Sequence, residues 1–158
     1  MSARRLSDPV RAALDIFATI KGELERKAKS DEEKSDFGRA LRARARDAPG
    51  LIEEVGLVPA LSFFYSRSSY GKSDKIKSDK IGYELMLKAI LLYLQRIQIV
   101  SSNINLDAIL GEERDTDAMI NLLRSLLERS TVAVPILRPF LVEFKRLCEA
   151  AWSERGSS

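Results

Sequence analysis

The sequence contains no histidine, and this absence removes the commonest general base, the imidazole zinc ligand and every Ser–His or Cys–His pair. It contains a single cysteine, Cys148, which excludes an intrachain disulfide and a cysteine-rich metal site. No glycine-rich phosphate-binding motif is present, because the 8 glycines are scattered along the chain. Acidic runs stand beside expected helix starts, where carboxylates complement the helix dipole more often than they bind a metal. The sequence therefore predicts a protein that is not an enzyme and that uses no cofactor or metal.

Long hydrophobic runs are also missing. The longest apolar stretch, Ala89–Leu94, is far shorter than the ~20 residues that a membrane-spanning helix needs. Near the first residue, arginines are followed by Asp8 and Pro9 rather than by the apolar segment of a signal peptide. We therefore expect a cytoplasmic protein with no membrane partner.

Residues that break regular structure are scarce, and this favours long helices. The chain has 8 glycines and 5 prolines in 158 residues, and its hydrophobic fraction of 45% is enough for a core. Apolar residues recur at three- and four-residue spacing, and no segment shows the alternation typical of a strand. We expect an all-α fold, a single-domain bundle of about six helices over residues 1–158. The expected helices cover residues 9–29, 35–47, 49–55, 59–66, 80–100 and 116–129, with a last helix from 131 or 135 to 154.

Some of these helices carry explicit expectations about caps and buried faces. Ser7 is expected to cap the first helix, and Asp115 or Thr116 the helix that follows residue 115. The apolar stripes predict inward-facing side chains, and the expected set includes Val10, Leu14, Phe63, Ile120 and Leu127.

Proline and glycine mark the expected helix ends. Pro49 is expected to end the second helix, because the residue before a proline avoids the helical region. Gly56 is expected to supply the left-handed position after the third helix. Pro135 and Pro139 predict a kink or a late start in the last helix.

A polar stretch contains a tandem duplication, since Lys72-Ser73-Asp74-Lys75-Ile76 is followed at once by Lys77-Ser78-Asp79-Lys80-Ile81. A duplication of this kind is accommodated only where the backbone is not packed. We expect residues 66–80 to form an exposed basic loop.

Four arginines, Arg39, Arg42, Arg44 and Arg46, fall within eight residues that contain no acid. Positions 39, 42 and 46 share one face of a helix, and Arg44 is displaced from it. Like charges repel, and a phosphate backbone is the partner that guanidinium groups bind bidentately. The alternative is a solvated helix face whose arginines pair with glutamates from elsewhere in the fold. Near this basic region, Tyr65 and Tyr70 are the candidate aromatics for base stacking.

Charge is distributed unevenly along the chain although the net charge is only +3. Residues 37–82 carry nine Lys and Arg against five Asp and Glu, and residues 103–130 carry three against six. Such a dipole suits head-to-tail stacking of like molecules with basic groups along a polyanion. If about three phosphates are neutralised, RNA affinity should fall with salt with a slope near ~−2.

The segment from Ala48 to Phe64, preceded by a basic helix, resembles the small helical subunit of type III-B CRISPR RNA-guided effector complexes, the Cmr complexes. The matching positions in that segment are Pro49, Leu51, Ile52, Gly56, Leu57, Leu61 and Phe63. Farther on, Tyr83–Leu94 resembles the family's long Leu-rich helix, and Leu141–Ala150 resembles its final helix. The resemblance covers roughly residues 35–66, 81–98 and 117–152.

The resemblance implies a non-catalytic protein present in several copies, stacked beside larger subunits that together cradle a guide RNA–target RNA duplex. The implied partners are other CRISPR effector subunits, copies of the chain itself, and the guide and target RNA. By position, Arg42 and Arg46 are the first candidates for phosphate contacts. Further candidates are Arg39, Arg44, Lys72 and Lys75.

Two other functions stay open at this point. One is a helical protein–protein adaptor whose basic patch meets an acidic partner. The other is a helix-turn-helix regulator, but the helix expected over residues 59–66 is too apolar to lie in a DNA groove.

Overall fold

The computed structural model describes residues 8–69 and 77–153, and within these ranges it is all-α, as predicted, with no strand. The described helices are α2 (Pro9–Lys27), α3 (Asp31–Val55), α4 (Leu57–Arg67), α5 (Lys77–Arg96), α6 (Leu106–Ile109), α7 (Thr116–Leu127) and α8 (Ser130–Ala151).

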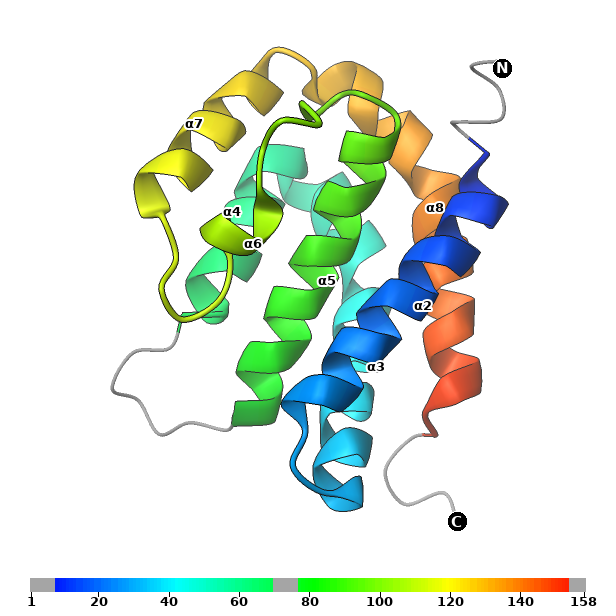
Figure 1. Cartoon of the computed structure of the whole chain (residues 1–158). Coiled ribbons are helices and arrows are strands. Elements are labelled where there is room, and N and C mark those ends of the chain that lie inside the picture. Colours follow the sequence, from blue (N-terminus) through cyan, green and yellow to red (C-terminus); the bar gives the residue numbers. More distant parts are fainter. Residues whose placement is uncertain (1–7, 70–76, 154–158) are drawn as a thin grey trace.

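Helix α5 forms the centre of the bundle, with α2 and α8 on one side of it and α4, α6 and α7 on the other (Figure 1). Its residues from Ile81 to Leu94 are almost all buried, so its apolar surface runs nearly all round the helix. Such a helix needs neighbours on every side, and α5 packs against α2, α3, α4 and α8. The buried apolar side chains of these helices form one continuous core.

The first described helix, α2, is capped by Asp8, whose carboxylate accepts hydrogen bonds from the backbone N–H groups of Val10 and Arg11. Pro9 occupies the first helical position, where its missing N–H costs nothing. The cap is therefore one residue later than the predicted Ser7, which lies outside the described residues. The prediction that Val10 and Leu14 face the core is wrong, because both side chains are exposed on the edge of the helix.

The prediction that Pro49 ends a helix is wrong, because α3 continues through it from Asp31 to Val55. Buried Leu41, Ala45, Ala48 and Ile52 form one stripe across the proline, and their packing against α5 and α8 outweighs the proline's cost of ~3 kcal/mol. The helix also starts earlier than predicted. Ser30 caps it by accepting a hydrogen bond from the Glu33 N–H.

Gly56 joins α3 to α4 with a φ of +97°, so the predicted positive φ is confirmed, but its ψ of 163° lies outside the left-handed helical region. The connection between α4 and α5 is shorter than the loop predicted over residues 66–80. Arg67 still belongs to α4, and α5 begins at Lys77, so both ends of that range are helical. Residues 70–76 lie outside the described residues.

Both C-terminal helices differ in part from the prediction. Helix α8 begins at Ser130 and contains Pro135 and Pro139, and Figure 1 shows the predicted kink as a change in its axis direction in the first half. The predicted late start is wrong. Both prolines are exposed, so water can bond the carbonyls that they leave unpaired.

Helix α7 is capped by Asp115, one of the two predicted cap residues. Ile120 and Leu127 are exposed rather than inward.

None of the helices in residues 8–69 and 77–153 combines the length and the apolar character that crossing a bilayer requires.

Candidate nucleic-acid interface

Helix α3 carries the four arginines of the cluster and separates them onto two flanks. Because the helix is unbroken, Arg39, Arg42 and Arg46 follow one another at three- and four-residue spacing along a single flank. Helix α8 borders that flank, since Gly38 of α3 lies against the Trp152 ring at the end of α8, and Glu53, seven residues beyond Arg46, pairs with Arg138 of α8. Arg44 lies on the opposite flank, against Tyr83 of α5. The predicted common face and the displacement of Arg44 are both confirmed.

The two outer arginines of this flank make ion pairs within α3. The Arg39 guanidinium lies 2.6 Å from the Asp36 carboxylate, and Arg46 Nε lies 3.6 Å from Asp47 Oδ1. The Arg46 side chain is 56% exposed and its partner 48% exposed. Ion pairs in water are worth only about 0–1 kcal/mol, so a phosphate group can compete for these guanidinium groups.

Arg44 is held firmly within the fold. Its guanidinium stacks over the Tyr83 ring at 4.6 Å, donates a hydrogen bond to the Tyr83 hydroxyl and pairs with Asp47 at 3.3 Å. Only 24% of the side chain is exposed. The structure therefore gives Arg44 a role in fastening α3 to α5. The two lysine candidates, Lys72 and Lys75, lie outside the described residues.

Helix α8 adds basic residues to the same side of the molecule, which sequence reasoning missed. Arg138 pairs with Glu53 at 2.6 Å, and Glu53 lies seven residues beyond Arg46 on α3. Lys145 lies seven residues beyond Arg138, so it shares that face of α8. We call the set Arg39, Arg42, Arg46, Arg138 and Lys145 the arginine flank. Its α8 members could not be found from the sequence, because only the packing of α8 on α3 brings them there.

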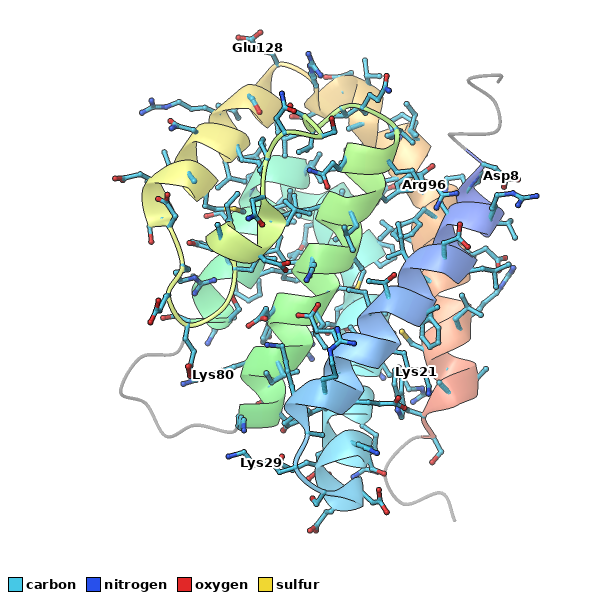
Figure 2. All side chains as sticks on the ribbon, in the orientation of Figure 1. Asp8, Lys21, Lys29, Lys80, Arg96 and Glu128 are labelled. Carbon is cyan, nitrogen blue, oxygen red and sulfur yellow. The ribbon has the colours of Figure 1, made fainter. Side chains whose placement is uncertain are left out.

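The acidic segment, residues 103–130, carries its carboxylates on other elements than the arginine flank. Its carboxylates belong to α7 and the segment before it, and α7 packs on α4 and α6. Figure 2 shows Glu128 at one end of the bundle and Lys29 and Lys80 near the other. The dipole predicted from the two sequence segments stays a prediction.

The one cysteine, on which a nucleophilic role would depend, is enclosed. Cys148 is fully buried, and burial raises the pKa of its thiol well above the ordinary value. In the described part of the chain, no three Cys, Asp or Glu side chains converge in a way that could hold a metal ion. Tyr65, a predicted stacking residue, has Arg114 over its ring at 3.8 Å. The other predicted stacking residue, Tyr70, lies outside the described residues.

No protein-family model matches this sequence. A search among curated proteins likewise finds no significant match.

Solved structures do match. One is a chain of the type III-B Cmr-beta complex bound to non-cognate target RNA, with a TM-score of 0.72 and 21% identity, covering 93% of this chain and 97% of that one. Another is a chain of the Cmr-beta complex bound to cognate target RNA and AMPPnP, with a TM-score of 0.71 and 21% identity, covering 94% and 98%. The resemblance drawn from the sequence is thus confirmed at the level of the fold: this chain shares its architecture, over nearly its whole length, with a chain of type III-B Cmr complexes.

Proposed function

We propose that this chain is a non-catalytic small subunit of a type III-B CRISPR RNA-guided complex, stacked along the guide and target RNA and contacting the target RNA backbone. The observation that carries the proposal is the fold match, because it extends over almost the full length of both chains and both matched complexes are bound to target RNA. Base pairing between guide and target would supply sequence choice, and this chain would supply backbone contacts.

The arginine flank is the surface proposed to meet the RNA. Three guanidinium groups follow one flank of a single helix, and a guanidinium group can bind a phosphate with a bidentate pair of hydrogen bonds. Arg42 is half-buried and its Nε is enclosed, so its terminal nitrogens would make the contact. Arg42 and Arg46 are the central pair, and Arg39 extends the row. Lys145 and Arg138 of α8 would add positive potential beside them.

Exposed apolar side chains support contacts with protein neighbours. Six of them lie on α2, on α7 and on the first half of α8: Val10, Leu14, Ile120, Leu127, Val132 and Ile136. Another, Val142, lies between Arg138 and Lys145 on α8. With basic residues on α3 and acidic residues around α7, copies of the chain could stack head to tail while their arginine flanks follow one RNA.

The test is RNA retention by the assembled complex carrying Arg42→Ala and Arg46→Ala. Loss of two phosphate contacts should weaken binding of target RNA by about tenfold or more, most strongly at low salt. The matched control is Arg11→Ala with Arg26→Ala, which removes the same charge from exposed positions on α2 and should leave binding near that of the wild type.

A helical adaptor without direct RNA binding is the second candidate, and the exposed apolar residues of α2, α7 and α8 favour it. The same double arginine variant separates the two functions. Unchanged RNA retention with lost capture of the partner subunits would support the adaptor and contradict the RNA-binding role.

A further inference from the structure

Phe63 is an exposed aromatic residue on α4, a helix whose buried residues are Leu57, Ala60, Leu61 and Phe64. Its side chain is 38% exposed, whereas its neighbours Leu61 and Phe64 are almost completely buried, so the prediction that Phe63 faces the core is wrong. The ring is nevertheless held in place. It meets the Tyr83 ring edge to face at 5.9 Å and the Phe64 ring at 6.2 Å.

Two arginines border this aromatic pair. Arg67 lies one turn beyond Phe63 on α4, and its guanidinium carbon is 5.1 Å from the centre of the Phe63 ring. Among the described residues, no carboxylate pairs with Arg67. Arg44 covers the Tyr83 ring on the other side. A rigid aromatic face with one tethered arginine and one solvent-exposed arginine therefore lies on the surface formed by α3, α4 and α5.

We propose that Phe63 and Arg67, backed by Tyr83 and Arg44, bind one unstacked nucleotide of RNA. The base would stack on the exposed face of Phe63, and Arg67 would move from the ring to the adjoining phosphate. This inference rests on the proposed RNA-binding function and adds a base contact to it. An apolar protein anchor fits less well, because two guanidinium groups border the aromatic pair.

The site is separate from the arginine flank. Arg44 contacts Tyr83 of α5, whereas Arg42 and Arg46 lie on the opposite flank of α3. The two surfaces can therefore be altered independently, and they should differ in ligand preference. Phosphate contacts serve duplex and single-stranded RNA alike, but a stacking residue needs a base that is not already stacked in a helix.

The experiment measures binding of the full chain to a single-stranded oligouridylate and to a blunt RNA duplex of equal length, by fluorescence anisotropy. Phe63→Leu keeps an apolar side chain and loses the aromatic face, so single-strand affinity should fall by roughly 5- to 100-fold while duplex affinity stays within about twofold. Phe63→Trp should retain single-strand affinity. Ile136→Ala, at a similarly exposed apolar position on α8 that points away from Arg138 and Lys145, is the matched control and should change neither.

Each other outcome is decisive. Equal losses on both RNAs, or no loss on either, while Arg42→Ala with Arg46→Ala still weakens binding, would overturn the stacking site and leave the proposed function standing. Wild-type chain that binds neither RNA at millimolar concentration would overturn the stacking site, whereas the proposed function is decided by RNA retention in the assembled complex. If Phe63→Leu leaves RNA binding intact but abolishes association with effector subunits, the aromatic surface is a protein contact and the inference is wrong.

Discussion

Lys88 is a charged residue inside the central helix, and its partners explain why it is tolerated there. Its ammonium lies 2.5 Å from a Glu23 carboxylate oxygen and 2.6 Å from one of Asp107, so it ties α5 to α2 and α6. Nearby, Glu84 is buried and pairs with Lys27 at 3.5 Å. Burial opposes the charge of Lys88, but hydrogen bonds to Asp107 and Glu23 outweigh it and raise its pKa.

Lys88→Met should destabilise the protein by about 2–4 kcal/mol, because it removes the nearest cation from the half-buried Glu23 carboxylate and leaves it only Lys27, at 4.0 Å. Urea unfolding measures this change. Lys21→Met breaks an exposed pair with Glu25 and should cost at most ~1 kcal/mol. An equal loss of stability in the two variants would show that the buried ion pairs of Lys88 contribute no more than an exposed pair.

The raised pKa of Lys88 also predicts how stability depends on pH. A group whose pKa is higher in the folded state stabilises the protein fully below its unfolded pKa of about 10.4 and loses that effect as pH rises through the folded value. Wild-type stability should therefore fall as the pH rises above about 10, and Lys88→Met should show a smaller fall. Urea midpoints measured across this range provide the test.

Cys148 should behave as an inert core residue. Because burial raises the pKa of its thiol and hides it from solvent, iodoacetamide should label the native protein only through unfolding. The labelling rate at pH 8 should therefore rise with urea in step with the unfolded fraction. Labelling in buffer as fast as in concentrated urea would contradict this expectation.

Helix packing depends on how closely α3 approaches α5. A Cβ atom added at Gly82 would lie 2.9 Å from the backbone of Ala40, so Gly82→Ala should destabilise the protein by about 1–3 kcal/mol. Gly50→Ala is the matched change on α3. Its Cβ would enter open space, and alanine's higher helix propensity should stabilise the protein by about 0.5–1 kcal/mol. Melting temperatures of both variants test this, and a shift of the same sign in both would contradict it.

Local sequence pattern predicted most of the helices and failed where packing decides. Apolar spacing was sufficient to place α2, α5, α7 and α8, because an amphipathic helix repeats its apolar residues locally. The interruption at Pro49 was wrong because the stripe Leu41–Ala45–Ala48–Ile52 is buried against two other helices, and this gain lies outside any local window. The same reasoning covers Ile120 and Leu127, whose exposure depends on which face of α7 meets α4.

The sequence could predict the α3 members of the arginine flank, but not the residues that other helices place beside them. Spacing alone places Arg39, Arg42 and Arg46 on one flank of a helix. The neighbouring Arg138 and the burial of Arg44 against Tyr83 depend on contacts between residues far apart in the chain. The exposure of Phe63 has the same origin, since α4 is apolar on more than the face that it buries.

For the whole molecule, the arginine flank predicts a defined response to ionic strength. Three neutralised phosphates on single-stranded RNA should give a slope near ~−2 in a plot of log affinity against log salt concentration. Arg42→Ala with Arg46→Ala should reduce the slope to about −0.7, because one contact remains. Filter binding over a series of salt concentrations measures both slopes. A flat response of the wild type would contradict a phosphate-binding surface.

The single tryptophan occupies a junction of three helices. Trp152 ends α8, its ring packs 5.7 Å from that of Phe17 on α2, and it fills the space left by Gly38 on α3, where an added Cβ would lie 2.1 Å from the indole. Its fluorescence emission therefore comes from one known place, without added label. A shift in that emission would report a separation of α2, α3 and α8. Measured during assembly, it would show whether neighbouring subunits loosen the packing beneath the arginine flank.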